Sequence, residues 1–346
     1  MKNCNVLLTC CGGLISPSQI KSLKGVRERK IRITGVDMDD NAVGRYLCDT
    51  FYQVPGGGSP EYIKTLLGIA QKEAIVVILP ASHEESLVLA KQRSVFEEKG
   101  IKIAVSSYET LSRAYDKGRC YQFLKDKHLP CPEFYVVRKA DEFKNYAAKL
   151  GFPEQNIVMK PVLSRGGRGA KILTKKGVAH YLLNEKPGSL YADYESTLKT
   201  LENLKEDFPE MVLMEYLPGD YYSVDFLAKE GKALIIVPKI RIKGNPSQTL
   251  VGRVHRNTEV EELTKNISKA FNFDYNVNIE MKYSKHGQAL PYDINPRIAA
   301  SVAFCTEAGA NLIYYAVKLA LGEEIPQCPP IKDNLMMIRY LSELYI

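Results

Sequence analysis

The chain has 346 residues, of which 45% are hydrophobic and 25% charged, and it contains no tryptophan. These fractions exclude a disordered chain, and the length excludes a small disulfide scaffold. The chain is long enough for two or three domains, each with its own hydrophobic core. The net charge of +7 is a small excess, which suits a phosphate-bearing ligand as well as a nucleic acid.

The cysteines and the apolar runs indicate a protein of a reducing compartment. None of the eight cysteines forms a CxxC pair or a His/Cys cluster with zinc-ligand spacing, so we expect buried thiols and no structural zinc. The first apolar run, residues 6–11, is too short for a signal peptide, and no run reaches the roughly 18 residues of a membrane span. We therefore expect a cytoplasmic protein.

The first hundred residues alternate short β-branched runs with amphipathic stretches. The pattern predicts strands at residues 6–9, 31–36, 75–79 and 101–105, and helices at residues 61–72 and 84–93. Strands that alternate with helices in this way are typical of an α/β fold with a doubly wound parallel sheet.

A glycine pair, Gly12-Gly13, follows the first of these strands. A dinucleotide-binding loop would need a third glycine at the start of the next helix, and this chain has Leu14-Ile15-Ser16-Pro17 instead. A tight turn is therefore favoured over nucleotide binding at this loop. An NAD-dependent oxidoreductase built on residues 1–108 stays open as an alternative.

The remaining chain mixes helices with antiparallel strands. A helix over residues 109–127 must end before Pro130, and a closing helix over residues 302–321 ends at Gly322. Two hairpins are expected, one pairing residues 223–228 with 233–240 and one pairing residues 276–283 with 288–294. Shorter elements are expected at residues 134–137, 140–150, 157–161, 195–206 and 212–216.

A glycine-rich basic loop follows the strand at residues 157–161. Lys160 lies at the end of that strand, and the loop Ser164–Gly169 contains three glycines and two arginines. Glycine allows backbone N–H groups to approach an anion closely, and Lys160 adds a positive charge at the base of the loop. The pattern indicates an anion-binding loop; a basic surface turn is the alternative.

Carboxylates and amides alternate on the second hairpin. Glu280 and Asp293 are on its two strands and can face the same side, as can Asn278 and Asn295, two residues away from each. An oxygen-only set of this type suits Mg²⁺, which takes one or two carboxylates and completes its shell with phosphates and water. Arg297 is placed to pair with an anion in the same site. Two exposed acidic residues on a hairpin are the alternative.

A third candidate segment connects two strands. An apolar strand ends at Glu215, the backbone of Tyr216 and Leu217 becomes accessible, and a turn follows at residues 218–219. Free backbone groups at such a point can bind the edge of an adenine, and Asp220 can bind ribose hydroxyls.

In this order, the motifs resemble those of the ATP-grasp superfamily, in particular the carboxylate–amine ligases related to carbamoyl-phosphate synthase and biotin carboxylase. Asp116-Lys117, which opens a helix, and the run Asp293–Arg297 are similar to the corresponding motifs of that family. The resemblance extends over the whole chain. It implies a Rossmann-like pre-ATP-grasp domain at residues 1–108, a small lobe with linker helix and glycine-rich lid at 109–217, and a large lobe with the magnesium site at 218–346.

The resemblance also implies a role for each matching residue. Lys117 and Lys160 would contact the phosphates of ATP, under a lid that contains Ser164, Gly166, Gly167 and Gly169. Glu215, Tyr216 and Leu217 would bind adenine and Asp220 the ribose. Glu280, Asp293 and Asn295 would hold Mg²⁺, with Mn²⁺ as an alternative ion. Arg297 would bind the acceptor carboxylate or its acyl phosphate. The family usually has glutamate in place of Asp293, and often in place of Asp220.

The residues that contact the substrate are less well marked. Lys239 and Arg241 share one face of a strand, which either faces solvent or faces the cleft and contacts a phosphate or a carboxylate; we include both, with Arg297, among the candidate catalytic residues. His255, in the loop with Arg253 and Arg256, is the histidine expected near the cleft. His83, His128, His180 and His286 are expected at the surface or in loops.

The sequence thus predicts an ATP- and Mg²⁺-dependent ligase that forms a C–N bond. It would convert a carboxylate into an acyl phosphate and transfer the acyl group to an amine, releasing ADP and phosphate. Carboxyphosphate or carbamoyl-phosphate chemistry and a non-catalytic ATP-binding regulator are the alternatives. We expect small-molecule substrates, no nucleic-acid or membrane partner, and a homodimer as one option for the assembly; the acid and the amine stay unidentified.

Overall fold

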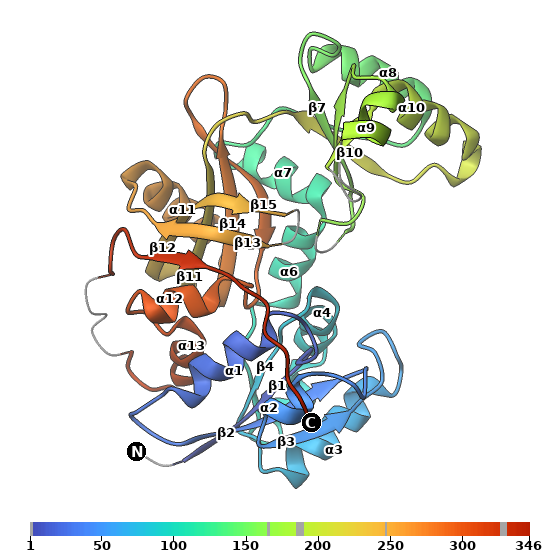
Figure 1. Ribbon diagram of the computed structural model, residues 1–346. Helices are drawn as coiled ribbons and strands as arrows, with labels where there is room; N and C mark the ends of the chain where they lie inside the picture. Colours follow the sequence, from blue (N-terminus) through green and yellow to red (C-terminus); the bar gives the residue numbers. More distant parts are fainter. Residues whose placement is uncertain (1–2, 165–166, 185–189, 246–247, 326–330) are drawn as a thin grey trace.

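The computed structural model describes residues 3–164, 167–184, 190–245, 248–325 and 331–346. Figure 1 shows three regions along the chain, each organised around its own sheet: an N-terminal region, a lobe that projects from the rest, and a central lobe. The cysteines that the structure describes are free thiols, as expected, and Cys328 lies outside the described residues. No helix among the described residues is long and apolar enough to cross a membrane.

The N-terminal region is a parallel sheet with strand order β3-β2-β1-β4-β5. Its strands are β1 (Cys4–Leu8), β2 (Ile31–Asp37), β3 (Thr50–Gln53), β4 (Val77–Leu79) and β5 (Lys102–Ile103). Its helices are α1 (Ser16–Lys24), α2 (Gly44–Leu47), α3 (Tyr62–Lys72), α4 (His83–Lys91) and α5 (Arg93–Glu97). The predicted doubly wound sheet is confirmed. The sequence pattern missed α1 and β3, because neither carries a clear apolar period.

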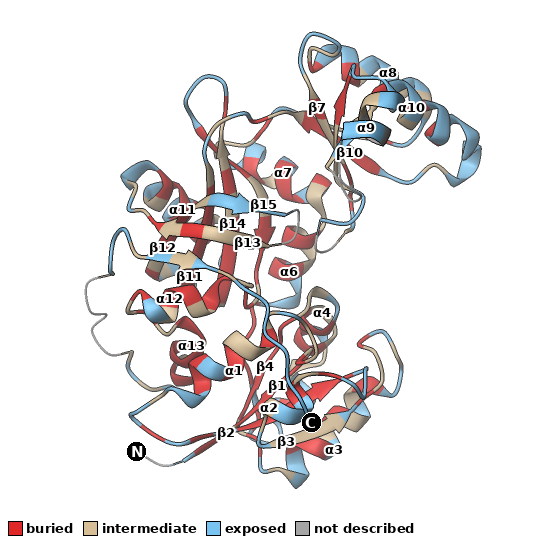
Figure 2. Cartoon of the chain, in the orientation of Figure 1, coloured by how far each residue is buried: buried red, intermediate tan, exposed pale blue. Residues whose placement is uncertain are grey.

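The projecting lobe is a mixed sheet of order β6-β10-β7-β8-β9, in which only β8 and β9 run parallel among the described strands. The strands are β6 (Phe134–Val137), β7 (Ile157–Pro161), β8 (Lys171–Thr174), β9 (Tyr191–Asp193) and β10 (Met211–Glu215). Its helices are α8 (Ala140–Lys149), α9 (Val178–Asn184), α10 (Tyr194–Asn203) and the short 3-10 helix Lys205–Asp207. Figure 2 shows that much of the surface of these helices is exposed, while the apolar sides of α8 and α10 pack on the sheet.

The central lobe is an antiparallel sheet of order β15-β14-β11-β12-β13-β16. The strands are β11 (Tyr221–Lys229), β12 (Lys232–Gly244), β13 (Thr249–Val254), β14 (Tyr275–Tyr283), β15 (Ala289–Asn295) and β16 (Met336–Ile338), and the helices are α11 (Thr258–Phe271), α12 (Val302–Glu307) and α13 (Leu312–Ala320). Both predicted hairpins are confirmed. At the turn between β11 and β12, Glu230 and Gly231 both have positive φ, as a tight hairpin turn of the favoured hand requires.

Two predicted helices are each divided in the structure. The helix expected at residues 109–127 is α6 (Tyr108–Tyr115) followed by α7 (Lys117–Asp126), because Asp116 has an extended backbone and its side chain accepts a hydrogen bond from the N–H of Arg119 as the α7 N-cap. The closing helix is α12 followed by α13, divided near Gly309, which has a φ of 109°. Apolar periodicity continued across both breaks and hid them.

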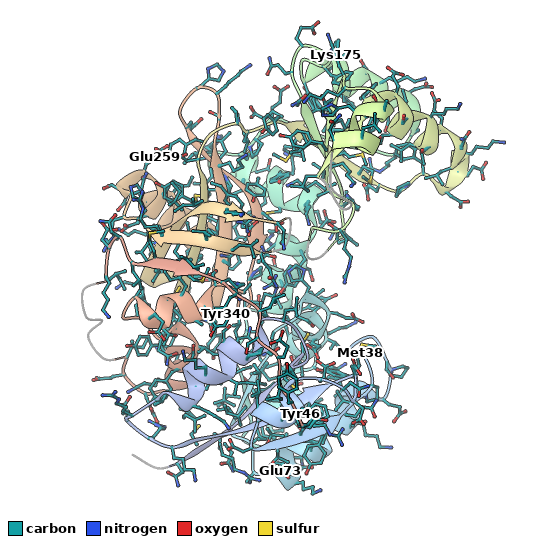
Figure 3. The ribbon with its side chains drawn as sticks, viewed as in Figure 1. Met38, Tyr46, Glu73, Lys175, Glu259 and Tyr340 are labelled. Atoms are coloured by element: carbon teal, nitrogen blue, oxygen red, sulfur yellow. The ribbon has the colours of Figure 1, made fainter. Side chains whose placement is uncertain are left out.

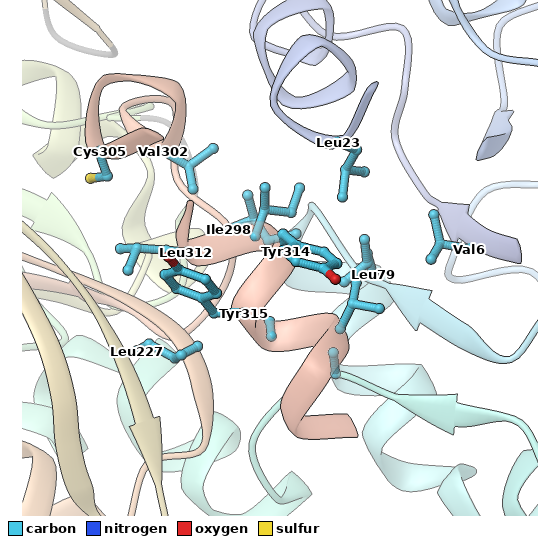
Figure 4. Close-up of a cluster of buried hydrophobic side chains, with 14 of the residues drawn as sticks. Val6, Leu23, Leu79, Leu227, Ile298, Val302, Cys305, Leu312, Tyr314 and Tyr315 are labelled. Carbon is cyan, nitrogen blue, oxygen red and sulfur yellow. The ribbon is translucent and has the colours of Figure 1, made fainter. Parts of the chain in front are cut away.

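The N-terminal and central regions share one hydrophobic core. Leu23, Val6 and Leu79 from the first sheet and its helix face Leu312 and Tyr314 of α13 (Figure 4), within a cluster that also contains Leu227, Ile298, Val302 and Cys305. The apolar surface buried in this cluster attaches α12 and α13 to the N-terminal sheet. The large apolar residues labelled in Figure 3, such as Met38 and Tyr340, are instead exposed.

The glycine loop after β1 is a tight turn that a carboxylate from the adjacent strand β2 closes. The N–H of Gly12 donates a hydrogen bond of 2.7 Å to Oδ2 of Asp37, at the end of β2. A Cβ on Gly12 would lie 2.9 Å from both Asp37 Oδ2 and Ala42 Cβ. The loop therefore presents this amide to a carboxylate of the same chain, which argues against the binding of a dinucleotide phosphate there.

We predict that Gly12→Ala lowers the free energy of unfolding by about 1–3 kcal/mol, because the added methyl group must displace the Asp37 carboxylate or Ala42. Urea unfolding followed by circular dichroism would measure the change. Gly68→Ala is the matched control: Gly68 lies inside α3 with no atom within 4 Å of an added Cβ, so alanine should leave stability unchanged or raise it by about 0.5–1 kcal/mol. Equal effects of the two substitutions would contradict this account of the loop.

Candidate active site

A cavity of about 200 Å³ lies between the projecting lobe and the central lobe. Strands β7, β8 and β10 contribute one wall, and β11, β12, β14 and β15 contribute the other. The charged lining residues are Lys117, Lys160, Lys171, Arg241, Glu280, Lys282 and Asp293. The cavity is therefore mainly cationic, with two carboxylates on the wall formed by the central lobe.

Lys117 enters this cavity because of the break between α6 and α7. As the first residue of α7, it follows the N-cap Asp116, and its backbone N–H donates to the carbonyl of Val162 at 3.1 Å. Its ammonium group donates to the carbonyl of Ser164 at 3.3 Å and lies 3.7 Å from Oδ1 of Asp293. Lys117 thus connects the glycine-rich loop to the central lobe.

Lys160 is a buried cation at the edge of the same cavity. Its ammonium donates to the carbonyl of Tyr292 at 2.7 Å and to the hydroxyl of Tyr121 at 2.9 Å, and the Tyr121 hydroxyl also donates to that carbonyl. Burial, with a smaller contribution from the like charge of Lys117, lowers the pKa of Lys160 to about 8. An anionic ligand would favour its charged form.

Glu280 and Asp293 are directly opposite each other in the register of β14 and β15, and both line the cavity. Burial raises the pKa of Glu280, and Arg241, at 3.7 Å, opposes this only in part. Burial would also raise the pKa of Asp293, but Lys117 and Lys160 outweigh it and the pKa lies below its ordinary value. The predicted orientation of the two carboxylates toward one side is therefore present.

Asn295 has partners on both sides of its amide. Its Nδ2 donates to Oδ2 of Asp293 at 3.0 Å, and its Oδ1 accepts from Nε2 of His83 at 2.9 Å. The expectation that His83 is a surface or loop residue is wrong: it opens α4 of the N-terminal region and stacks on Tyr115. Burial and the nearby charge of Arg297 lower the pKa of His83 to about 3, so the imidazole is neutral and can donate one hydrogen bond.

A second, smaller cavity adjoins the first and shares four of its lining residues. Its polar lining residues are Ser223, Arg241, Thr249, Asn278, Glu280, Asp293, Asn295, Arg297, Ser301 and Arg339. Glu280, Asp293, Arg241 and Gly167 belong to both cavities. The acidic pair therefore lies where the two cavities meet.

Arg241 and Lys239 occupy different environments although they are two residues apart on β12. The guanidinium of Arg241 lines both cavities, stacks on Tyr221 with 3.9 Å to the ring centroid, and donates to Thr249 Oγ1 at 2.9 Å. Lys239 lines neither cavity; it is buried and donates to Oδ2 of Asp225 at 2.8 Å. The predicted exposure of Lys239 to the cleft is not what the structure has.

The segment expected to bind adenine is divided between cavity and surface. Tyr216 and Leu217 line the larger cavity, and Lys282 lies over the Tyr216 ring at 5.2 Å. Glu215 does not line it; its carboxylate accepts from the N–H of Glu133 at 2.9 Å. Asp220 is exposed and also outside the lining.

The lid and His255 complete the placement of the expected residues. Ser164 and Gly167 line the larger cavity, Gly169 has a φ of 73° and packs against Pro161, and Gly166 lies outside the described residues. His255, the histidine expected near the cleft, lines neither cavity. Its Nδ1 pairs with the Tyr222 hydroxyl at 2.6 Å.

Sequence reasoning missed several lining residues. Lys282 could have been found, because it is two residues from Glu280 on the same strand face. Tyr292 precedes Asp293 directly; its hydroxyl donates to Oε2 of Glu280 at 3.0 Å, and its backbone carbonyl accepts from Lys160, a contact that no side-chain motif reveals. Nothing in the local sequence marks Arg339, which lines the smaller cavity, or His83, which pairs with the cavity residue Asn295 from the N-terminal region.

Family models match two parts of the chain. One described as "PylC-like, N-terminal domain" matches residues 6–104, and one described as "ATP-grasp in the biosynthetic pathway with Ter operon" matches residues 207–343. The carbamoyl phosphate synthase large chain of Archaeoglobus fulgidus is 23% identical over 272 residues, which are 75% of this chain and 23% of that protein. The chain thus spans about a quarter of the length of the curated relatives it matches.

Solved structures of similar fold cover nearly the whole chain. The N5-carboxyaminoimidazole synthetase of Staphylococcus aureus, complexed with ADP, has a TM-score of 0.72 at 16% identity and covers 98% of this chain and 82% of its own. The dimeric biotin carboxylase domain of the Hydrogenobacter thermophilus 2-oxoglutarate carboxylase, in complex with MgADP, ADP and bicarbonate, has a TM-score of 0.69 at 17% identity and covers 96% of this chain and 73% of its own. Both share the fold of this chain.

The buried Asp225–Lys239 pair generates a stability prediction. Asp225 also accepts from Ser301 and Asn278, so Lys239→Met should leave a buried, uncompensated carboxylate and cost about 3–5 kcal/mol in urea unfolding. Adding Asp225→Asn removes that charge and should restore most of the loss. A double variant as unstable as Lys239→Met alone would show that packing, and not the unpaired charge, causes the loss.

Proposed function

The chain has an ATP-grasp fold preceded by a PylC-like N-terminal domain, and from this premise we propose that it is an ATP- and Mg²⁺-dependent ligase that joins a carboxylate to an amine. Residues 1–108 form the pre-ATP-grasp domain, 109–217 the small lobe with its lid, and 218–346 the large lobe in this proposal. The observation that carries it is one cavity in which two lysines face a directly paired Glu280 and Asp293.

Lys117 and Lys160 bind the phosphates of ATP in this proposal. Both ammonium groups line the cavity, and Ser164 and Gly167 of the glycine-rich loop lie beside them. The backbone of Tyr216 and Leu217 takes the adenine edge, in a part of the cavity that Met214 and Ile172 also line. Glu215 and Asp220 do not line the cavity, so they would contact the nucleotide only if the segment that carries them moved toward it.

Glu280 and Asp293 fit a divalent cation. Burial disfavours the charge on Glu280, and a bound cation would compensate for it. Among the described residues no group of three or more His, Cys, Asp or Glu side chains could hold a metal, so a cation at these two carboxylates would need further oxygen ligands from the substrate or water. Glu280 and Asp293 would hold Mg²⁺, which would neutralise charge on the phosphates; Mn²⁺ would suit the same oxygen donors. Asn295, already bonded to His83 and Asp293, orients Asp293 or rotates to join the ligands.

The two cavities divide the reaction between them. A carboxylate oxygen of the acid attacks the γ-phosphorus of ATP and ADP leaves, which gives an acyl phosphate. The amine then attacks the acyl carbon, phosphate leaves, and the amine proton passes to water or to the departing phosphate. Lys117, Arg241 and Arg297 stabilise the negative charge on the transferred group, and closure of the loop after β7 excludes water.

The matched proteins include an N5-carboxyaminoimidazole synthetase and a biotin carboxylase domain, both in complex with ADP, which supports a ligase that uses ATP. The described cysteines are free, which supports a cytoplasmic protein, and the N-terminal domain is a candidate surface for a homodimer such as the matched carboxylase domain forms. Small-molecule acids and amines are the proposed substrates. Carboxyphosphate chemistry would appear in the test below as bicarbonate-dependent release of ADP.

We predict that Glu280→Gln and Asp293→Asn each lower Mg²⁺-dependent ADP release by at least about 100-fold, because they remove the proposed cation ligands. The assay combines ATP, Mg²⁺, a panel of small carboxylic acids and bicarbonate, with hydroxylamine as the amine that traps acyl phosphates. Glu262→Gln, an exposed residue of α11, is the control and should retain full activity. Binding of ATP without ADP release under any condition would favour a non-catalytic ATP-binding protein.

The lowered pKa of Lys160 predicts weaker nucleotide binding at high pH. With a pKa of about 8 in the free protein, Lys160 loses its proton as the pH rises through 8, while bound phosphates keep the proton on; affinity should therefore fall by up to about tenfold per pH unit above 8. Calorimetric titration with a nonhydrolysable ATP analogue between pH 7 and 9.5 would measure it. Lys160→Met should bind more weakly at pH 7 and lack this slope; an identical slope in both proteins would contradict the assignment.

A further inference from the structure

Three arginines from separate segments line the smaller cavity: Arg241 of β12, Arg297 after β15, and Arg339 directly after β16. The acidic lining residues are Glu280 and Asp293, which the proposed function commits to a cation. If the two carboxylates bind the cation, the three arginines leave positive charge in this cavity that the phosphates of ATP do not use.

The three guanidinium groups differ in how far the protein neutralises them. Arg241 lies 3.7 Å from Glu280 and stacks on Tyr221. Arg297 donates to the carbonyl of Ile298 and, at 3.5 Å, to Oδ1 of Asn295. Within the described parts of the chain, no carboxylate lies within ion-pair distance of Arg297 or Arg339. Two partly buried arginines thus line one cavity, and neither is in ion-pair contact with the carboxylates that the structure describes.

Arg339 is held in place by backbone groups from two sides of the cavity. Strand β16 pairs with β13 at the edge of the central sheet, and the N–H of Arg339 donates to Leu250. Its Nε donates to the carbonyl of Thr249 at 3.2 Å and its Nη2 to the carbonyl of Ala300 at 3.0 Å. A guanidinium has five N–H donors, so three remain for a ligand. The side chain of Arg339 is half-buried and held by two hydrogen bonds, and its other N–H groups can bind a ligand.

We propose that the smaller cavity binds an acid with two anionic groups, and that Arg339 binds the group that does not react. This inference rests on the proposed function: the carboxylate nearer to Arg297 and the acidic pair attacks the γ-phosphorus, and the second anionic group stays with Arg339 as an unreacted carboxylate or phosphate. No bond to that second group forms or breaks.

The size and lining of the cavity agree with a small acid. Its volume is about 60 Å³, room for roughly four to six water molecules at about 10–15 Å³ each, which suits a compact acid. Ser223, Thr249 and Ser301 add hydroxyl groups, which suit polar substituents of such an acid. A long acyl chain would find only Ala299 and Ala300 as apolar contacts among the lining residues that the structure describes.

The test compares acids that differ only in the second anionic group. Binding to the full chain, loaded with Mg²⁺ and a nonhydrolysable ATP analogue, is measured by calorimetry for four pairs: malonate against propionate, succinate against butyrate, L-aspartate against L-2-aminobutyrate, and the phosphate-bearing 2-phosphoglycolate against glycolate. We expect at least one diacid, or 2-phosphoglycolate, to bind tenfold or more tightly than its monoacid counterpart. A preference for succinate or for 2-phosphoglycolate tells which second group is recognised.

Arg339→Gln is then expected to remove that preference. The affinity of the preferred diacid should fall at least tenfold, while the affinity of the monoacid and of the ATP analogue changes less than twofold. Arg339→Lys should retain part of the preference, and Ile338→Ala, at an exposed neighbour on β16, should retain all of it. Melting temperatures of the variants show whether each is folded; if Arg339→Gln is not, the wild-type pairs decide alone.

Two results would overturn the inference, and they are distinguishable from failure of the proposed function. Equal binding of every diacid and its monoacid counterpart, or equal loss of both in folded Arg339→Gln, rejects the assignment of Arg339 and leaves the ligase proposal standing. No binding of the ATP analogue by the wild type rejects both.

Discussion

The organisation of the site depends on the balance of charge around one half-buried carboxylate, that of Asp293. Asp293 is opposite Glu280 across two strands, and each would resist ionisation next to the other if the site held no cation. Lys117 and Lys160 keep Asp293 charged, although they come from a helix start and a strand end in other parts of the chain. All four groups line the cavity between the lobes.

The N-terminal region contributes to this balance as well as to stability. Its sheet is attached to the central lobe by the core around α13, and that attachment brings the start of α4 to the edge of the acidic pair. His83, neutral and stacked on Tyr115, fixes the amide of Asn295, which in turn donates to Asp293. Packing between regions therefore determines the orientation of a side chain in the site.

Strand β16 shows the same dependence at the other end of the site. Its pairing with β13 places Arg339 beside Arg297, and two backbone carbonyls hold the guanidinium there. The three arginines of the smaller cavity come from separate segments, whereas in the larger cavity Lys160 and the glycine-rich loop follow one another in sequence. A local motif therefore marks part of the larger cavity, and long-range packing brings the arginines of the smaller cavity together.

The sequence by itself determined the parallel N-terminal sheet, the two hairpins and the facing of Glu280 and Asp293, because strand periodicity and hairpin turns are local properties. It did not determine that Lys239 pairs with Asp225, that His83 contacts Asn295, or that Arg339 lines the smaller cavity. Lys239 and Arg241 are two positions apart on β12, so the strand pattern places them on the same face. Only the charged groups packed against that strand make Lys239 part of a buried ion pair with Asp225 and leave Arg241 in the cavities next to Glu280. Those charges come from strands and loops far away in sequence, so only the tertiary structure decided them.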